Sequence, residues 1–386
     1  MDNEIRPVPG NSHPPLTRPG GIDIDSPKTT ARPVRAQVTR HLRTVSIVTA
    51  VSLGLVLGAC TSEDDTALGN QPFPGSSGES SGERSTLFAP YVYVDTAGRP
   101  TLSEAADETG SKSFVLAFIL AGPGECTPSW NGVRPVDDQR LATEVAQLRQ
   151  RGGDVIVSTG GASGPYLENA CSSADDLAAA YKSALDAVGS NHLDVDVEDE
   201  IPVGMVNDAL AKLQQDRRTT VTYTLQVENA EEGLTASAMD VLGDARDHGL
   251  QIIVNAMVMN FGYTGGWGPA MVSAAESAVR QMSEIWPDED PASLRGRFGI
   301  TTMIGRNDSG MVTTLDDART LADYVRSNRL AYVGFWSMAR DNGDCPGKKE
   351  ITDACSGVTQ ERYEFTGMFK NVAVERNSTS FRSEDK

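Results

Sequence analysis

The sequence is poor in histidine, with four among its 386 residues. Only His192 and His248 follow residue 60, and no two cysteines have the Cys-x-x-Cys spacing of many zinc sites. A histidine-rich metal centre or a Ser-His-Asp triad would therefore have few residues from which to form. Any reactive group has to be sought among other side chains.

Basic residues are also scarce. Lysine and arginine number 34 against 53 aspartates and glutamates, which gives a net charge of -19 at pH 7. Proteins bind nucleic acids largely by neutralising phosphates, so this balance argues against a nucleic-acid partner. It suits an exported protein with a neutral or cationic ligand.

A third absence is that of a long hydrophobic run. The apolar stretch from Val45 to Ala59 is shorter than the roughly 20 residues of a membrane span, but it is typical of a secretory signal. It ends Leu57-Gly58-Ala59-Cys60, which resembles the bacterial lipobox. The resemblance implies cleavage before Cys60 and a lipid on its thiol, which would hold the protein at the outer face of the cell membrane. An ordinary signal peptide with secretion is the alternative.

The composition divides the chain into four parts. Residues 1–59 are an N-terminal extension with the signal, and residues 60–85 are an acidic linker rich in serine and glycine. Residues 86–371 are enough for one large domain, and residues 372–386 form a polar tail. We expect a monomer that contacts the membrane only through its lipid anchor.

Four cysteines remain if Cys60 is lipidated. An even number in an exported chain indicates disulfides. Cys345 and Cys355 are close enough in sequence to staple one loop, and Cys126 would then join Cys171 and tie two loops together. Zinc binding is the alternative, without a typical spacing to support it.

Strand and helix patterns alternate between residues 88 and 337. The expected strands are Phe88–Asp95, Phe114–Leu120, Asp154–Ser158, Leu193–Glu198, Thr219–Val227, Gln251–Phe261, Phe298–Ile304 and Ala331–Ser337. Helical patterns lie between them, as at Leu141, Val145 and Leu148. This alternation predicts a (β/α)8 barrel. A doubly wound open sheet is the alternative, but no glycine-rich dinucleotide fingerprint follows any strand.

Acidic and aliphatic residues alternate in the fourth expected strand. Its period of two places Asp194, Asp196 and Glu198 on one face. Three neighbouring carboxylates repel each other, so they are tolerated on a solvated edge strand or where they share protons in chemistry. Barrel strands have no free edge, and barrel chemistry lies at the carboxyl ends of the strands, where Glu198 is placed. The barrel prediction therefore favours the catalytic interpretation.

Four motifs on the expected strands resemble glycoside hydrolase family 18, the chitinase family, over roughly residues 88–370. Asp194, Asp196 and Glu198 match the last three acidic positions of D-G-x-D-x-D-x-E, and Ser158-Thr159-Gly160-Gly161 matches S-x-G-G. Met257-Val258-Met259-Asn260-Phe261 is similar to M-x-M-D-F, and Trp336 matches the tryptophan of the eighth strand. Flanking segments resemble the bacterial chitinase-D-like branch; they are Phe88–Tyr91, Met303–Asp308 and Arg340–Val358.

The resemblance implies a retaining, substrate-assisted hydrolysis of β-1,4-linked N-acetylglucosamine polymers that needs no metal or cofactor. Glu198 would be the general acid and then the base, while the substrate's acetamido oxygen attacks the anomeric carbon. Asp196 would bind the acetamido N–H and share a proton with Asp194, which can keep Glu198 protonated near neutral pH. Trp336 would stack on the reacting sugar.

Three departures from the family pattern bear on activity. Asn260 stands where the family usually has aspartate, which removes a charge beside the reacting sugar. Asn191 and His192 replace the first Asp-Gly of the strand motif, and Gln226 replaces a usual proline in the acetamido pocket. We expect His192 to pack at the barrel bottom, although pairing with a carboxylate is the alternative. These changes predict an active enzyme that is slow or has an unusual pH profile.

Other residues are expected to shape the sugar site. Substrate contacts are expected from side chains near the strand ends: Tyr91, Ser158, Gly160, Gly161, Gln226, Met259, Asn307, Trp130 and Trp267. The two tryptophans lie in loops, where they can equally be anchors.

Two rival functions remain open. The departures from the motif would fit a cell-surface carbohydrate-binding protein on a degenerate barrel. The same chemistry would also fit an endo-β-N-acetylglucosaminidase acting on N-glycans or peptidoglycan. An attached chitin-binding module is not evident, which mildly favours soluble oligosaccharides.

Overall fold

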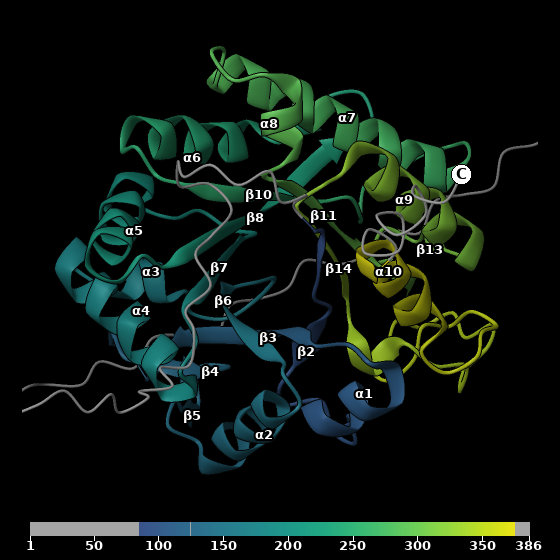
Figure 1. Ribbon diagram of the computed structural model, residues 1–386, viewed down its shortest axis with the longest axis horizontal. Helices are drawn as coiled ribbons and strands as arrows, with labels where there is room; N and C mark the ends of the chain where they lie inside the picture. The colour runs from purple at the N-terminus through teal and green to yellow at the C-terminus, as the bar shows by residue number, and fades with distance from the viewer. Residues whose placement is uncertain (1–84, 124, 375–386) are drawn as a thin grey trace, which may run out of the picture. The chain divides into compact units, whose positions relative to one another are not determined.

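The computed structural model describes residues 85–123 and 125–374 (Figure 1). The predicted signal, the Cys60 lipidation site, nearly all of the linker and residues 375–386 of the polar tail lie outside the described residues. None of the helices within the described range is long and apolar enough to cross a membrane.

The described residues form a closed barrel of parallel strands inside a ring of helices (Figure 1). The barrel strands are β1 Leu87–Phe88, β2 Tyr91–Tyr93, β3 Ser113–Ala121, β6 Asp154–Gly160, β7 His192–Val197, β8 Thr220–Asn229, β10 Ile252–Met257, β11 Phe298–Met303 and β14 Tyr332–Trp336. From β2 to β14 each pairs in parallel with its neighbour in this order, and β1 pairs in parallel with β14. The predicted (β/α)8 fold is confirmed.

Short strands and helices complete the fold. The minor strands are β4 Pro128–Trp130, β5 Arg134–Pro135, β9 Gly233–Leu234, β12 Gly305–Arg306 and β13 Val312–Thr313. The helices are α1 Leu102–Thr109, α2 Gln139–Gln150, α3 Leu167–Ala170, α4 Ala174–Val188, α5 Val203–Arg217, α6 Ala236–Asp247, α7 Trp267–Ile285, α8 Pro291–Arg295, α9 Leu315–Asn328 and α10 Glu364–Val374, with a 3-10 turn at Met338–Arg340.

The first expected strand is divided into β1 and β2. Leu87 and Phe88 pair with β14, whereas Tyr91, Val92 and Tyr93 pair with β3. Pro90 lies between the two pieces and has no N–H to donate to a ladder. The break lets one short segment close the ring by bonding to a different neighbour on each side of the proline.

Successive side chains of each barrel strand point alternately to two apolar cores, one between the strands and the helices and one inside the barrel. Residues such as Phe114 and Val155 pack toward the helices, while Val115 and Ile156 pack inside the barrel. In β7, Leu193 contributes to the helix-facing core, so the intervening acidic residues face the barrel interior. This is the alternation expected from the sequence.

The sixth barrel strand is shorter than predicted. β10 ends at Met257 rather than Phe261, because Val258 turns to bond the carbonyl oxygens of both Ala256 and Thr301. Asn260 then adopts a left-handed backbone conformation, with φ of 62°. The turn carries Met259 and Asn260 to the mouth of the barrel.

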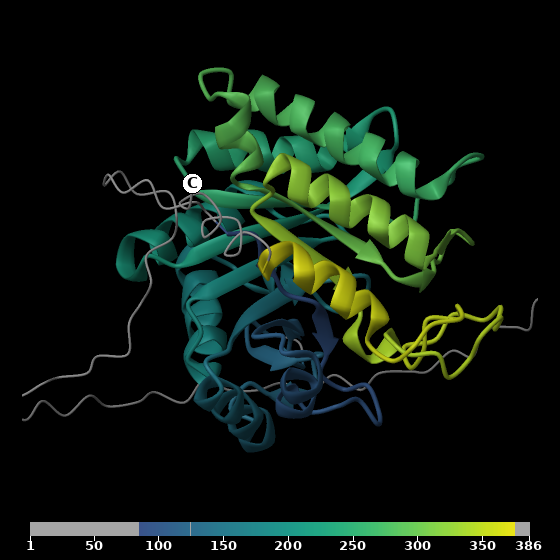
Figure 2. The ribbon, with the colours of Figure 1, turned by 45° about the vertical axis from the view of Figure 1, so that its right-hand side comes forward.

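Both predicted disulfides are confirmed. Cys126 bonds to Cys171, which ties the segment after β3 to the end of α3. Cys345 bonds to Cys355 within the long segment between β14 and α10. Figure 2 shows this segment, drawn in yellow, projecting outward at the right of the view.

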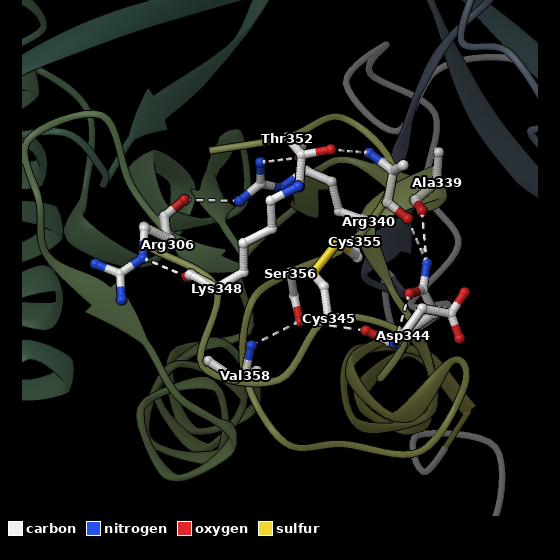
Figure 3. The surroundings of a disulfide bond; sticks show 12 residues. Arg306, Ala339, Arg340, Asp344, Cys345, Lys348, Thr352, Cys355, Ser356 and Val358 are labelled. Carbon is white, nitrogen blue, oxygen red and sulfur yellow. Dashed lines mark hydrogen bonds between the residues drawn. A yellow bond between two sulfur atoms is a disulfide. The ribbon is translucent and has the colours of Figure 1, made fainter. Parts of the chain in front are cut away.

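Arg340 anchors the same segment from inside (Figure 3). Its Nη1 donates to the Thr352 carbonyl at 2.7 Å, and its Nη2 donates to the carbonyls of Ile304 at 3.0 Å and Arg306 at 2.6 Å. Burial lowers the pKa of Arg340 to about 10, so the guanidinium remains charged at neutral pH. The disulfide and this arginine together fix the course of the loop around residue 353.

Candidate active site

A cleft of about 580 Å³ opens at the carboxyl ends of the barrel strands. Of the residues predicted to act in the site, seven line it: Tyr91, Asp196, Glu198, Gln226, Met259, Asn260 and Trp336. Its volume lies within the range of about 300–1,000 Å³ that is common for small-molecule sites. The cleft therefore collects residues from β2, β7, β8 and β14 and from the turn after β10.

Asp194 lies beneath the cleft floor, inside the barrel. Its Oδ2 accepts hydrogen bonds from the Tyr91 hydroxyl at 2.8 Å and the Ser158 hydroxyl at 2.7 Å, and its Oδ1 accepts one from Thr224 at 2.6 Å. Burial raises the pKa of Asp194 to about 6, although these three donors act in the opposite direction. Asp194 can thus hold a proton under mildly acidic conditions.

Asp196 is buried without the hydrogen bonds that Asp194 receives. It is 4% exposed, and its Oδ1 has no hydrogen-bond partner among the described residues. Burial raises its pKa well above the usual value, and the charges of Glu198 and Asp194 raise it further. A carboxyl group in this state binds a proton or a donor supplied by a ligand.

The hydroxyl partners of Asp194 were missed by the sequence interpretation, which considered only the acidic residues. Three hydroxyl groups on neighbouring strands donate to this carboxyl group. The negative charge of Asp194 raises the pKa of Asp196. The proton that the two carboxyl groups are expected to share stays a prediction.

Glu198 follows the last residue of β7 and is partly buried at the cleft wall. Burial raises its pKa to about 7, and the negative charge of Asp308 contributes to the shift. Its backbone N–H donates to the Tyr166 hydroxyl at 3.0 Å, and that hydroxyl donates to the Gly161 carbonyl at 2.6 Å. Glu198 is therefore a positioned acid that retains its proton up to about neutral pH.

Asn260 is held by the loop that follows β11. Its Nδ2 donates to Asp308 Oδ2 at 3.0 Å, and its Oδ1 accepts the Asp308 backbone N–H at 2.8 Å. Its own backbone N–H donates to Asn307 Oδ1 at 3.2 Å. The amide at position 260 thus brings a carboxylate, that of Asp308, to the cleft from another strand.

Aromatic rings form one wall of the cleft. Trp336 is partly exposed and stacks on Phe118, with ring centroids 5.7 Å apart and an interplanar angle of 12°. The rings of Tyr91 and Tyr93 lie 6.1 and 6.0 Å from that of Trp336, both tilted. An indole supported in this way offers a fixed apolar surface to a flat ligand.

The two tryptophans expected in loops lie at the end of β4 and at the start of α7, where they are anchors and do not line the cleft. Trp130 is fully buried and donates its indole N–H to the Val136 carbonyl. Trp267 is 5% exposed, donates to the Thr313 hydroxyl and packs on Phe261. The predicted sugar contacts of both residues are corrected for this reason.

Four further predicted contact residues support the site from behind. Ser158 is fully buried and bonds Asp194, and Asn307 is fully buried with its amide on the carbonyls of Met303 and Gly305. Gly160 and Gly161 have positive φ, and a Cβ at Gly160 would lie 2.0 Å from the Asp196 carbonyl oxygen. Gly160 lets β6 approach β7, Gly161 makes room for the ring of Phe118 on β3, and neither glycine lines the cleft.

His192 lies at the opposite end of β7 from Glu198, and its Nε2 is 2.8 Å from the Thr222 hydroxyl. Burial lowers its pKa to about 3, so the ring is neutral. The expectation that it packs at the barrel bottom is confirmed.

Several cleft residues were missed by the sequence interpretation. Tyr93, Phe118, Glu228 and Asp353 line the cleft, and Tyr166 holds the backbone of Glu198. Phe118 and Tyr93 sit on predicted strands, so the period-two pattern could have marked them. Nothing in the sequence indicates that the loop bearing Asp353 folds over the barrel mouth.

Comparison with known proteins gives two curated relatives. No protein-family model matches the chain. A probable bifunctional chitinase/lysozyme of Escherichia coli (strain K12) is 30% identical over 309 residues, which are 73% of this chain and 34% of that protein. Endochitinase 11 of Metarhizium anisopliae is 30% identical over 277 residues, which are 66% of this chain and 52% of that protein. The chain spans about a third to a half of the length of these relatives.

Solved structures match over the barrel. The catalytic domain of a hyperthermophilic chitinase from Pyrococcus furiosus has a TM-score of 0.69 and 28% identity, covering 78% of this chain and 99% of that one. Catalytic-site mutants of active domain 2 of the Pyrococcus furiosus enzyme, complexed with chito-oligosaccharides, have a TM-score of 0.68 and 28% identity, covering 79% of this chain and all of that one.

Proposed function

We propose that this chain is a chitinase-like member of glycoside hydrolase family 18 and that it hydrolyses β-1,4-linked N-acetylglucosamine chains. One observation carries the proposal: a partly buried Glu198 with its pKa raised to about 7 lies beside the unpartnered Asp196 in a cleft walled by Trp336. The relatives named as chitinases, and the neighbour complexed with chito-oligosaccharides, support the same substrate class.

In the proposed reaction, Glu198 protonates the glycosidic oxygen and the leaving sugar departs with that proton. The substrate's acetamido oxygen bonds to the anomeric carbon as the glycosidic bond breaks, which gives an oxazolinium-like intermediate. Glu198, now ionised, removes a proton from water as that water opens the intermediate with net retention. The proton returned to Glu198 completes the cycle.

The surrounding residues have separate roles in this scheme. Asp196 Oδ1, which has no partner among the described residues, accepts the acetamido N–H of the substrate. Asp194, fixed by Tyr91, Ser158 and Thr224, supplies charge from below. The exposed face of Trp336 stacks on the apolar face of the reacting sugar.

The test is hydrolysis of chitotetraose to chitohexaose by residues 86–386 and by Glu198→Gln. We expect the variant to lose activity by roughly 10²–10⁴-fold, because one positioned acid–base group accounts for about that factor. Calorimetry should show that the variant still binds chitohexaose. Glu200→Gln, an exposed carboxylate two residues along that does not line the cleft, is the matched control and should keep full activity. Near-normal rates for Glu198→Gln would refute the mechanism.

A carbohydrate-binding protein without turnover is the second candidate. It is motivated by Asn260, which replaces a charged residue of the family motif. Calorimetric binding of chito-oligosaccharides without product release by the wild type would favour it. Cleavage of N-glycans or peptidoglycan in preference to chito-oligosaccharides would instead favour an endo-β-N-acetylglucosaminidase of other specificity.

The lipid anchor is a further proposal. The lipobox-like Leu57-Gly58-Ala59-Cys60 supports it, and the two disulfides suit an oxidising compartment outside the cytoplasm. Mass spectrometry of Cys60 from a membrane fraction should find diacylglycerol on the thiol. Recovery of the unmodified cysteine in the medium would contradict the anchor.

A further inference from the structure

The ionisable residues that line the cleft are of one sign. Besides tyrosines, they are Asp196, Glu198, Glu228, Asp308 and Asp353, and among the described residues no lysine, arginine or histidine contributes to the lining. The last three are exposed at the rim. A ligand chain that extends beyond the reacting sugar therefore passes several negative charges.

Two of these rim carboxylates are held by no hydrogen bond or ion pair in the described part of the protein, although the buried charge of Arg340 acts on Asp353 through space. Glu228 and Asp353 form neither a hydrogen bond nor an ion pair with another described residue. Glu228 is on β8, whereas Asp353 is in the disulfide-closed segment after β14. These strands are three places apart in the barrel ring, so the two charges lie on separate parts of the rim.

Nearby arginines do not enter the cleft to neutralise them. Arg340 is fully buried, and its terminal nitrogens donate to backbone carbonyls, so it offsets the field only from behind the rim. Arg134 is paired with Asp95 and Asp138. The field in the cleft remains negative, and its attraction for cations is strengthened by low-dielectric walls.

A second feature points to a ligand with donors. Asp196 lines the cleft, and its buried Oδ1 has no hydrogen-bond partner among the described residues, so this carboxyl group can accept an N–H from the substrate. An N-acetylglucosamine unit supplies that N–H at the reacting position. A glucosamine unit supplies an ammonium group, with three donors and a positive charge, and could not carry out the acetamido attack. The geometry therefore separates a central position that needs the acetyl group from rim positions that favour a cation.

We propose that the cleft selects partially deacetylated chitin, in which N-acetylglucosamine at the reacting position is flanked by cationic glucosamine units. The inference rests on the proposed function and adds the charge of the substrate. Glu228 and Asp353 are the specificity residues, because they offer the free carboxylates. Glycans that carry carboxylates, as peptidoglycan does, are repelled by the same field.

The experiment compares chitohexaose with hexasaccharides of the same length that contain one or two glucosamine units at known positions. The value of kcat/KM is measured at mildly acidic pH, where the amine is protonated, and at low and high salt. We expect the best glucosamine-containing isomer to exceed chitohexaose by about threefold to tenfold at low salt, and this ratio to fall in high salt because exposed charges are screened. Mass spectrometry of the products should place glucosamine on either side of the cleaved acetylated unit.

Variants test whether Glu228 and Asp353 cause the preference for glucosamine-containing hexasaccharides. In the double variant Glu228→Gln and Asp353→Asn the ratio should fall to about one. The matched controls are Glu232→Gln and Asp344→Asn, exposed carboxylates outside the cleft that lie near the two positions, and they should leave the ratio unchanged.

The inference is wrong if the two substrates have equal kcat/KM values, or if the double variant keeps the preference. In either case, cleavage of chitohexaose would still support the proposed function. If no sugar is cleaved, the proposed function is wrong. The charge preference is then tested by calorimetry, as the ratio of the affinity for the glucosamine-containing hexasaccharide to the affinity for chitohexaose.

Discussion

The side chain of Asn260 and residue Asp308 are joined by two hydrogen bonds: Nδ2 of Asn260 donates to the Asp308 carboxylate, and the Asp308 backbone N–H donates to Asn260 Oδ1. An aspartate at position 260 could not donate the first of these bonds. The pair holds the Asp308 charge where it raises the pKa of Glu198. The chain thus keeps a carboxylate in this part of the cleft by a route other than the family motif.

Replacing Asp308 with asparagine tests this relationship. Asparagine keeps the size and can still accept from Asn260, but it removes the negative charge that favours protonated Glu198. The pKa of Glu198 should fall from about 7, so the acid form is lost at lower pH and the alkaline limb of kcat/KM moves to lower pH. The rate at neutral pH should fall roughly threefold to tenfold, with little change at acidic pH. An unchanged limb, or one moved to higher pH, would contradict the electrostatic role.

Tyr166 is expected to position the catalytic acid. Its hydroxyl accepts from the Glu198 N–H and donates to the Gly161 carbonyl. Tyr166→Phe leaves both backbone groups without that partner and should lower kcat by about tenfold with a smaller change in KM, since small misplacements of a catalytic group are costly. Steady-state kinetics alongside thermal unfolding separate the effects. A loss of stability with unchanged kcat would mean that the hydroxyl is only structural.

The two disulfides should differ in their consequences. Chain-entropy arguments give a loss of about 2.5 kcal/mol on removing Cys345–Cys355 and about 4 kcal/mol on removing Cys126–Cys171, whose sequence separations are 10 and 45. The first bond, however, closes the loop that carries Asp353 into the cleft. The double serine variant at 345 and 355 should therefore raise KM more while lowering Tm less than the variant at 126 and 171. The opposite order in KM would show that the loop keeps its place without the bond.

The buried carboxyl group of Glu168 should make the free energy of unfolding depend on pH, independently of catalysis. It is fully buried and accepts from the hydroxyls of Thr159 and Tyr181, and burial raises its pKa. The folded state then binds the proton more tightly than the unfolded state, so stability is highest below the unfolded pKa of about 4.3 and declines as pH rises through the folded value.

Glu168→Gln, which cannot ionise, should remove this decline. Urea unfolding of both proteins between acidic and neutral pH checks it, with the stability of the variant rising relative to wild type as pH increases. Glu168→Ala is the control for shape and should be less stable than wild type at every pH, because it leaves a cavity and two unpaired hydroxyls. Parallel curves for wild type and Glu168→Gln would mean that Glu168 does not bind a proton in the folded state.

The barrel and its catalytic strand could be predicted because they depend on local periodicity. Alternation along β7 places Asp194 and Asp196 inside and Leu193 outside, and this holds whatever the loops do. The hydrogen bonds that Tyr91, Ser158 and Thr224 donate to Asp194 from other strands were not predicted. Such partners depend on strand register, which a single sequence does not display.

Residues outside the barrel strands were harder to predict, for a different reason. An aromatic ring outside the barrel strands can bind a ligand or be buried, and Trp130, on the short strand β4, is buried with a hydrogen bond to Val136 that composition does not reveal. Asp353 reaches the cleft only because a disulfide and Arg340 hold its segment in place. Both outcomes are decided by contacts between residues that no periodic pattern relates.

The broken first strand has a consequence for how the chain folds. Leu87 and Phe88 pair with Tyr332 and Val333, and the Thr86 hydroxyl bonds the Leu330 carbonyl, so the barrel is sealed by residues about 240 positions apart in the chain. Contacts of such long range slow folding, because a large loop must be ordered before they form. Until β14 is synthesised, β1 lacks its partner and β11 has an open edge. The ring can therefore close only after nearly the whole domain is available, and the cleft, which takes Trp336 from that last strand, is completed in the same step.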